Sequence, residues 1–284
     1  MKIYRARYGG VCFGVKRAIE MSLTAAKKWK RVYSLGPLIH NRLAVEELTK
    51  KGIITTNDVA DITNKKVIIR SHGIQPRLLH RLKKQEYEII DATCPWVRKA
   101  QRYVERLISE GYHVIIVGEK DHPEVKGLLG YGGAHAEIYS DRMKIKHRKI
   151  GIVPQTTIDY EALNQAVLHL IDRVLELKIY NTICKATILR TREAVRIARK
   201  ADVMIVVGGK NSANTTRLYQ VCNKYKPSYH IESADEITMD WFEKAQSVGV
   251  TAGASTPREQ VDEVVAFLKK HSPAKGARPK NQNA

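Results

Sequence analysis

Three segments of the chain repeat one pattern, in which a cysteine opens a helical stretch that leads into an apolar strand ending at a glycine. The segments read GGVCFGVKRAIE, DATCPWVRKAQRYVE and NTICKATILRTREAV, and each cysteine precedes its glycine by 24 residues. The pairs are Cys12 and Gly36, Cys94 and Gly118, and Cys184 and Gly208. Because a constant spacing between a helix and a strand indicates an internal repeat, we expect three copies of one α/β unit.

Short apolar runs alternate with amphipathic helical stretches along the whole chain, which is typical of α/β proteins with mostly parallel sheets. The expected strands are residues 2–5, 32–35, 66–70, 87–90, 114–117, 150–153, 177–180, 203–207 and 248–251. The expected helices are residues 15–28, 96–109, 158–176, 191–200, 215–225 and 257–270. The strand at residues 2–5 leads into the first cysteine, as the strands at 87–90 and 177–180 lead into the others.

These elements predict three related α/β units, of which the last takes its first strand from the start of the chain. The predicted boundaries are residues 13–95, residues 96–190, and residues 191–271 together with 1–12. Residues 272–284, rich in proline, lysine, glycine and asparagine, are expected to be disordered.

Three similar units packed about a common pseudo-threefold axis would bring their cysteines to one point. Helix N-termini there would stabilise thiolates through the helix dipole. Distant cysteines without a CxxC pair are by themselves more often packed thiols, but the equal spacing favours a metal site. Zinc usually takes four ligands, whereas three thiolates suit a cubane cluster with one open iron. Cys222 has no equivalent position and is interpreted as a packed thiol.

Polar residues also recur after the three glycines. His40, His122 and Ser212 follow by four residues, and Arg42, Glu124 and Asn214 follow by six. Polar loops follow a second strand in each unit, as SHGIQP, QTTID and GASTPRE. Since ligands bind at the carboxyl ends of strands in open α/β sheets, we expect these loops to surround the cysteines.

The composition leaves several classes of function open. No run of about 18 apolar residues and no signal peptide is present, so we expect a cytoplasmic protein without membrane insertion. The net charge of +20 would suit nucleic acid, an anionic membrane or an anionic small substrate. A nucleic-acid-binding module and a nucleotide-binding protein with a structural metal are the rival interpretations. No RNA-binding or DNA-binding motif, GxGxxG or GxxxxGKS/T supports either of them.

Nine strings occur in order from about residue 9 to about residue 257: GGVCFGVKRAI, GPLIHN, RSHGI, DATCPWV, HPEV, PQTT, NTICKAT, VVGGKNSANTTRL and GVTAGAS. Together they resemble the successive motifs of 4-hydroxy-3-methylbut-2-enyl diphosphate reductases. The resemblance implies an α/β fold of three domains around one [4Fe-4S] cluster, held by Cys12, Cys94 and Cys184 with an open apical iron. It implies reductive loss of the substrate hydroxyl, giving isopentenyl and dimethylallyl diphosphates in the last step of the methylerythritol phosphate pathway.

The resemblance also assigns the polar residues. It implies that Glu124 delivers a proton and that Thr156 orients the substrate hydroxyl or a water. Without it, Glu124 would be interpreted as a surface residue in a first helical turn, and Thr156 as a helix N-cap. The implied diphosphate-binding residues are His40, His72, His122, Thr156, Ser212, Asn214 and Ser255.

Two positions depart from the family pattern. Ala213 replaces a serine of the KNSAN region, and Arg190-Thr191-Arg192 stands where an Arg-Gln pair is usual, which puts contacts at that helix in doubt. The family also implies a ferredoxin or flavodoxin as electron donor, and the basic charge would favour an acidic partner of this kind.

Overall fold

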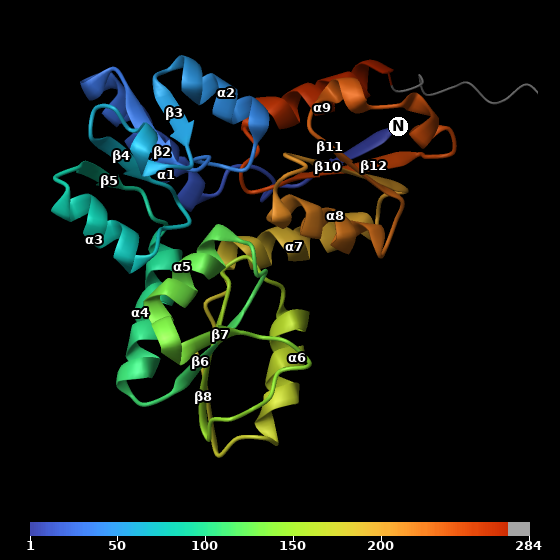
Figure 1. Cartoon of the computed structure of the whole chain (residues 1–284). Helices are drawn as coiled ribbons and strands as arrows, with labels where there is room; N and C mark the ends of the chain where they lie inside the picture. The colour runs from blue at the N-terminus through green and yellow to red at the C-terminus, as the bar shows by residue number, and fades with distance from the viewer. Residues whose placement is uncertain (272–284) are drawn as a thin grey trace, which may run out of the picture. The chain divides into compact units, whose positions relative to one another are not determined.

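The computed structural model describes residues 1–271 and contains three sheets, each of four strands that are all parallel. The strand orders are β1-β12-β10-β11, β3-β2-β4-β5 and β7-β6-β8-β9, so one topology occurs three times. Helices cover the sheets, as Figure 1 shows. This confirms the predicted α/β class and the internal repeat. Within residues 1–271, no helix is both long enough and apolar enough to span a membrane.

Contacts divide the described residues into two compact units, one made of Met1–Val11 with residues 189–271, and the other of Cys12–Ile188. The first unit contains one sheet and the second contains two. The predicted boundaries between three units stay a prediction, and the predicted disordered tail lies outside the described residues.

The sheet of the first unit joins the two ends of the chain. Its strands are β1 (Lys2–Arg5), β12 (Ser247–Ala252), β10 (Val203–Val207) and β11 (Ser228–Ile231). The register pairs Lys2 with Ser247. Its helices are α7 (Lys185–Ala198), which begins in the other unit, α8 (Ala213–Asn223) and α9 (Arg258–His271), with short 3-10 helices at Ala234–Glu236 and Met239–Phe242.

Alternation along β10 explains how the helices cover both faces of this sheet. Ile205 packs with residues of α9, whereas its neighbour Met204 packs with residues of α7 and α8. Successive side chains of a strand point to opposite faces, so a continuous apolar run is buried on both sides. Figure 1 shows α9 on one face and α7 with α8 on the other. Cys222 of α8 is fully buried on the same face as Met204.

The second unit contains two further sheets of the same design. One consists of β2 (Val32–Leu35), β3 (Ile53–Thr56), β4 (Lys66–Ile69) and β5 (Glu88–Asp91), with α1 (Phe13–Trp29), α2 (Arg42–Lys50), α3 (Pro76–Lys84) and a 3-10 helix at Val59–Asp61. The other consists of β6 (His113–Val117), β7 (Ala136–Ile138), β8 (Lys149–Pro154) and β9 (Glu176–Ile179), with α4 (Pro95–Ser109), α5 (Pro123–Gly132), α6 (Tyr160–Ile171) and a 3-10 helix at Gly133–His135.

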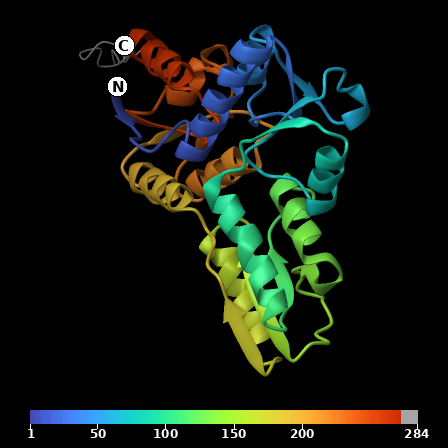
Figure 2. The same ribbon diagram turned by 90° about the vertical axis from the view of Figure 1, so that its left-hand side faces the viewer.

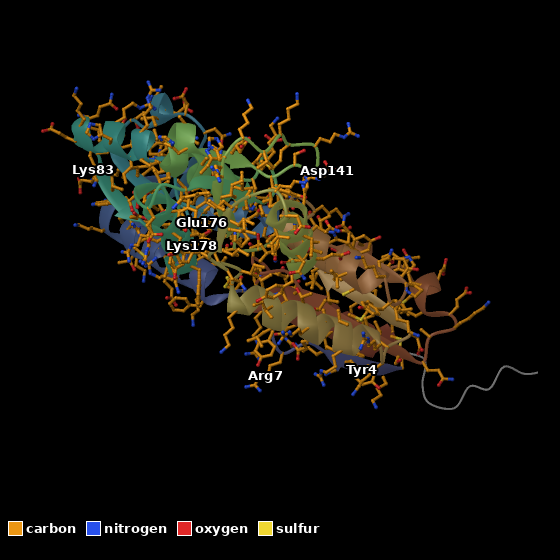
Figure 3. The ribbon with its side chains drawn as sticks, turned by 90° about the horizontal axis from the view of Figure 1, so that it is seen from below. Tyr4, Arg7, Lys83, Asp141, Glu176 and Lys178 are labelled. Atoms are coloured by element: carbon orange, nitrogen blue, oxygen red, sulfur yellow. The ribbon has the colours of Figure 1, made fainter. Side chains whose placement is uncertain are left out.

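The β6 sheet lies between α6 on one face and the pair α4 and α5 on the other. Figure 2 shows α4 and α5 side by side. Gly151 in β8 permits the close approach of α4, because a Cβ there would lie 2.6 Å from the Leu107 side chain. Polar and charged side chains remain outside, and Figure 3 shows Lys178 beside Glu176 on β9.

Two predicted helices need correction. The helix predicted at residues 158–176 ends at Ile171, because Glu176 already begins β9. The helix predicted at residues 191–200 begins earlier, at Lys185, directly after a cysteine of the repeat. Three short edge strands, β3, β7 and β11, were not predicted, although their positions are equivalent in the three sheets.

Candidate functional site

The three cysteines of the repeat all precede helices. Cys12 is the N-cap of α1, Cys94 is the N-cap of α4, and Cys184 directly precedes α7. Their carbonyls accept the first helical hydrogen bonds, from the backbone N–H groups four residues on at 2.9, 2.9 and 3.1 Å. All three are partly buried, whereas Cys222 is fully buried. Thiolates at helix N-termini are stabilised by the unpaired N–H groups and the helix dipole.

The sulfur of Cys94 lies close to the other two cysteines of the repeat. Burial raises the pKa of Cys94, the backbone N–H groups of Trp96 and Val97 lower it, and the negative charges of Cys12 and Cys184 raise it again. A cationic centre would offset this repulsion and favour the thiolate form of all three. The donor set therefore fits a metal or a cationic iron-sulfur core, whereas Cys222 belongs to α8 of the other unit.

The first turn of α1 contacts the Cys94 thiol. A Cβ built on Gly14 would lie 2.6 Å from the Cys94 sulfur, closer than side-chain carbons approach one another. Glycine at this position therefore lets the helix that follows Cys12 reach the second cysteine. Backbone hydrogen bonds fix the positions of Cys94 and Cys184. The Cys94 N–H donates to the Ser71 carbonyl at 2.9 Å, and the Cys184 N–H donates to the Thr156 carbonyl at 2.8 Å.

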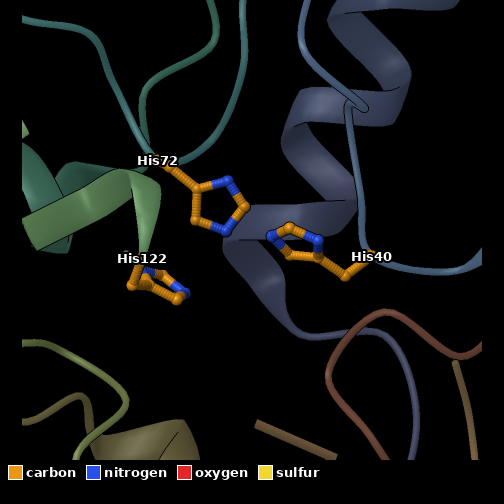
Figure 4. Close-up of side chains that lie close together, drawn as sticks. All are labelled: His40, His72 and His122. Atoms are coloured by element: carbon orange, nitrogen blue, oxygen red, sulfur yellow. The ribbon is translucent and has the colours of Figure 1, made fainter. Parts of the chain in front are cut away.

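Three histidines form a cluster in the same unit, shown in Figure 4. His40 follows β2, His72 follows β4, and His122 is the N-cap of α5. The ring centroids are 4.8 Å apart for His40 and His72, 5.3 Å for His72 and His122, and 6.1 Å for His40 and His122. One nitrogen of each ring lies within 4.8 Å of the others. The loops predicted to converge do so for these three residues.

The cluster is neutral at pH 7. Burial lowers the pKa of His40 to about 4, with a further contribution from the positive charge of Arg70. Burial also lowers the pKa of His72 well below its usual value, and His40, His122 and Arg70 add to the effect. Nε2 of His40 and Nδ1 of His72 are buried and have no hydrogen-bond partner among the described residues. Nδ1 of His122 accepts from the Glu124 N–H at 3.2 Å, so its proton is on Nε2.

Glu124 is a buried carboxyl rather than a surface glutamate. Its side chain is 1% exposed, and Thr156 is 4% exposed. Glu124 Oε1 accepts the Thr156 backbone N–H at 2.6 Å, and Oε2 accepts the Thr156 hydroxyl at 2.8 Å. Burial raises the pKa of Glu124 to about 7, although both bonds from Thr156 lower it. The carboxyl can therefore hold or release a proton at neutral pH.

Thr156 is not the N-cap of the following helix. Asp159 caps α6, with its side chain accepting the Ala162 N–H at 2.8 Å. The Thr156 hydroxyl instead donates to the Glu124 carboxyl, and the Thr156 carbonyl accepts the Cys184 N–H. One residue thus connects the buried acid to a cysteine of the repeat.

Ser212, Asn214 and Ser255 lie in the other unit, at the carboxyl ends of β10 and β12. Ser212 caps α8 by accepting the Thr215 N–H at 3.3 Å. The amide nitrogen of Asn214 is buried without a hydrogen-bond partner among the described residues, and Ser255 is buried. Gly253 provides room here, because a Cβ would collide with the Thr215 side chain. All three residues therefore lie on the side of the β10 sheet where its strands end.

The model of the LytB protein family matches residues 3–269, which is nearly the whole described chain. The chain belongs to the LytB family.

Relatives of known name agree with this membership. A 4-hydroxy-3-methylbut-2-enyl diphosphate reductase of Syntrophotalea carbinolica is 47% identical over 271 residues, which cover 93% of this LytB chain and 97% of that protein. The corresponding reductase of Geobacter metallireducens is 44% identical over 280 residues, with 97% of this chain and 99% of that protein covered.

Two solved structures are similar to this LytB protein. One is of (E)-4-hydroxy-3-methyl-but-2-enyl diphosphate reductase, the terminal enzyme of the non-mevalonate pathway, with 39% identity, a TM-score of 0.71, and coverage of 95% of this chain and 100% of that one. The other is the E-1-hydroxy-2-methyl-but-2-enyl-4-diphosphate reductase from Plasmodium falciparum, with 28% identity, a TM-score of 0.90, and coverage of 94% and 88%.

The local structure is intact at the two positions that depart from the family pattern in this LytB chain. Arg190 is buried within α7 and donates to the Gly10 carbonyl at 2.9 Å, so the helix is attached to the loop after β1. Ala213 is the first residue of α8 and leaves the Ser212 cap intact. Neither position removes a cysteine of the repeat.

Sequence reasoning missed Arg70, which directly follows β4 and lies against Gly36. Its charge acts on both His40 and His72. The available signal was its place in RSHGI, between a strand end and the loop that carries His72.

Proposed function

We propose that this protein reduces 4-hydroxy-3-methylbut-2-enyl diphosphate to isopentenyl and dimethylallyl diphosphates, as the terminal enzyme of the non-mevalonate pathway. The observation that carries the proposal is the buried Glu124 carboxyl with a pKa of about 7, bound by the residue whose carbonyl accepts from Cys184. This arrangement supports a role for Glu124 as proton donor beside the thiols that are proposed to hold a redox cluster. The identity of the substrate is inferred from the names of the two relatives that are 44% and 47% identical to this chain.

Cys12, Cys94 and Cys184 would hold a [4Fe-4S] cluster through three of its irons. The mutual effect of their charges on Cys94 and the close contact of Gly14 support this ligand set. When bound, the cluster would pass on the two electrons that an external donor supplies, and its open iron would act as a Lewis acid. The protein contributes the geometry of the pocket and the protons.

The reaction takes up two electrons and two protons and releases the substrate hydroxyl as water. Glu124 is proposed to donate the first proton to this hydroxyl while its carbon–oxygen bond breaks, because a carboxyl with a pKa near the working pH is an effective general acid. The Thr156 hydroxyl, 2.8 Å from Glu124 Oε2, would position the group that receives the proton. The second proton goes to the allyl carbon skeleton, and its position decides which product forms.

The diphosphate group is proposed to bind the cluster of His40, His72 and His122, together with Ser212, Asn214 and Ser255. Unpartnered imidazole and amide nitrogens in buried positions support this role, because buried polar atoms are normally hydrogen-bonded. A diphosphate with its many acceptor oxygens would satisfy them. Imidazole, hydroxyl and amide groups supply directional bonds on several sides.

An acidic ferredoxin or flavodoxin is the proposed electron donor, and the cytoplasm is the proposed location. The net charge of +20 would speed the encounter with an acidic protein. Basic side chains such as Arg7 and Lys83 are exposed, and Figure 3 shows both at the surface. With a protein donor, the turnover rate should fall as salt is raised, whereas with a small reducing dye it should change little. Equal salt sensitivity with both donors would remove this support.

Anaerobic purification followed by iron and sulfide analysis tests the function directly. The hydroxylated allylic diphosphate is then added with a chemical reductant, and the products are identified by mass spectrometry. A brown protein with about four irons that forms both isoprenoid diphosphates is expected. A protein that binds only zinc and stays colourless after anaerobic cluster reconstitution would instead favour a structural metal site.

A further inference from the structure

Arg70 is a half-buried guanidinium without a neutralising partner. Burial is the only cause that lowers its pKa, and no carboxylate contributes. Its Nε is buried without a hydrogen-bond partner, and no carboxylate within residues 1–271 forms an ion pair with its side chain. Burying an unpaired charge costs free energy, so a charge held in this way points to a ligand that completes it.

The backbone is shaped to hold this guanidinium. Gly36 ends the β2 region with a φ of 77°, and a Cβ there would lie 2.6 Å from Arg70 Nη1 and 2.7 Å from Cζ. Any side chain at position 36 would be strained and would displace the Arg70 head group. Gly36 is four residues before His40, and Arg70 is two residues before His72. The same two strand ends therefore position the cation and two of the histidines.

The charge of Arg70 is felt by the histidine cluster. It acts on both His40 and His72, whereas no carboxylate acts on either ring. Glu124 meets the cluster through its backbone N–H, which donates to His122, while its carboxyl oxygens are bound by Thr156. The neutral imidazoles of the cluster thus have a permanent positive charge near them. A metal ion would be repelled by Arg70, although one nitrogen of each ring lies within 4.8 Å of the others.

We propose that Arg70 is a further anion-binding residue of this pocket, and that it supplies the permanent positive charge by which the pocket prefers a diphosphate to a monophosphate. The proposal rests on the proposed function for the identity of the whole substrate, but the charge preference is a property of the pocket itself. A guanidinium offers parallel N–H groups that match phosphate oxygens, and its bonds to an anion are stronger than those between neutral groups. The second phosphate adds charge and acceptors that the neutral histidines can bind.

Calorimetric titration of the anaerobically purified protein with inorganic pyrophosphate and with orthophosphate tests this role. Arg70→Gln should weaken pyrophosphate binding about tenfold or more, the usual effect of losing a hydrogen bond to a charged group. It should also reduce the preference for pyrophosphate over orthophosphate. Arg70→Lys keeps the charge but loses the planar fork, so its affinity should lie between those of Arg70→Gln and the unchanged protein.

Arg81→Gln is the matched control, because it removes the same charge from an exposed position on α3 of the same unit. It should leave pyrophosphate binding unchanged. Circular dichroism and iron content identify any variant that fails to fold, and Arg70→Lys then serves as the test. Pyrophosphate affinity in a folded Arg70→Gln protein equal to that of the unchanged protein would overturn the proposal, as would an equal loss in Arg81→Gln.

Turnover separates this inference from the proposed function. Arg70→Gln should raise KM for the allylic diphosphate more than it lowers kcat, because it removes binding rather than chemistry. If the unchanged protein does not reduce the allylic diphosphate but binds pyrophosphate through Arg70, the function is wrong and the anion site stands. If turnover occurs and Arg70→Gln leaves KM unchanged, the function stands and the role of Arg70 is wrong.

Discussion

Thr156 binds both carboxyl oxygens of Glu124, one through its backbone N–H at 2.6 Å and the other through its hydroxyl at 2.8 Å. Burial raises the pKa of Glu124 to about 7, and these two bonds prevent a larger rise. The pair therefore holds a proton that is ready for transfer near neutral pH. It also keeps the carboxyl in one orientation, since both oxygens are bound.

Replacing Glu124 by Gln should lower turnover by about two orders of magnitude or more, because the general acid is lost. The amide has nearly the same shape, so the visible absorption spectrum of the cluster should not change. Glu105→Gln, at an exposed position on α4, is the matched control and should keep full activity. Near-normal turnover by Glu124→Gln would show that the proton comes from another group.

The turnover rate should fall as the pH rises above about 7, where Glu124 loses its proton. Thr156→Val removes the hydroxyl that stabilises the ionised carboxyl and keeps the backbone N–H. The pKa of Glu124 should rise further in this variant, so the falling limb should move to higher pH. Rate profiles measured from about pH 6 to about pH 9 give the pH at which the rate falls, whatever the maximal rate of each protein. A limb at the same pH in both proteins would contradict the assignment to Glu124.

Serine at position 12, 94 or 184 should abolish full cluster assembly, whereas Cys222→Ser should keep the iron content. Cys222 is fully buried in α8, and burial raises its pKa to about 12, which keeps its thiol protonated. Iron and sulfide analysis after anaerobic reconstitution measures the difference. Loss of iron in Cys222→Ser, with the fold intact by circular dichroism, would overturn the ligand assignment.

Gly14→Ala should impair cluster binding without removing a ligand. The new Cβ would lie 2.6 Å from the Cys94 sulfur, so either the thiol or the first turn of α1 must move. Gly127→Ala is the control, because its Cβ would meet only the His72 carbonyl, at 3.9 Å. We expect lower iron content in Gly14→Ala and normal content in Gly127→Ala. Equal iron content in both would mean that the Cys94 thiol is not held in this position when iron is present.

Pyrophosphate binding should be accompanied by proton uptake between about pH 6 and pH 7. Free His40 is neutral there because burial and Arg70 lower its pKa to about 4. A polyanion beside the ring favours the protonated form and raises this pKa, so binding takes up protons. Titration calorimetry in two buffers of different ionisation enthalpy gives their number. Heats that do not depend on the buffer would contradict this coupling.

The repeat predicted the fold well where the chain is apolar on both faces of a sheet. β1, β2 and β10 have the predicted bounds, and each end of the other predicted strands differs from the prediction by at most one residue. The missed strands β3, β7 and β11 are edge strands, paired on one side only. Sequences such as Ala136–Ile138 are short and partly exposed, so periodicity alone could not distinguish them from loops.

The site was predicted as a set of residues, but its electrostatics were not. Equal spacing placed the cysteines at helix starts, and the loops of His40, His72 and His122 converge as expected. The burial of Glu124 could not be read from HPEV, because a glutamate in a first helical turn is usually exposed. Its raised pKa depends on residues of other segments that exclude water. The roles of these residues stay predictions.

The strand that begins the chain pairs only with the strand made near its end. Lys2–Arg5 has no partner until Ser247–Ala252 has been synthesised. At about 5–20 residues per second, the intervening chain of about 245 residues takes roughly 10 to 50 s to leave the ribosome. The first residues to be synthesised are therefore among the last to join a sheet. A protein fused to the N-terminus would, throughout that interval, be attached to a strand whose backbone N–H and C=O groups are unpaired.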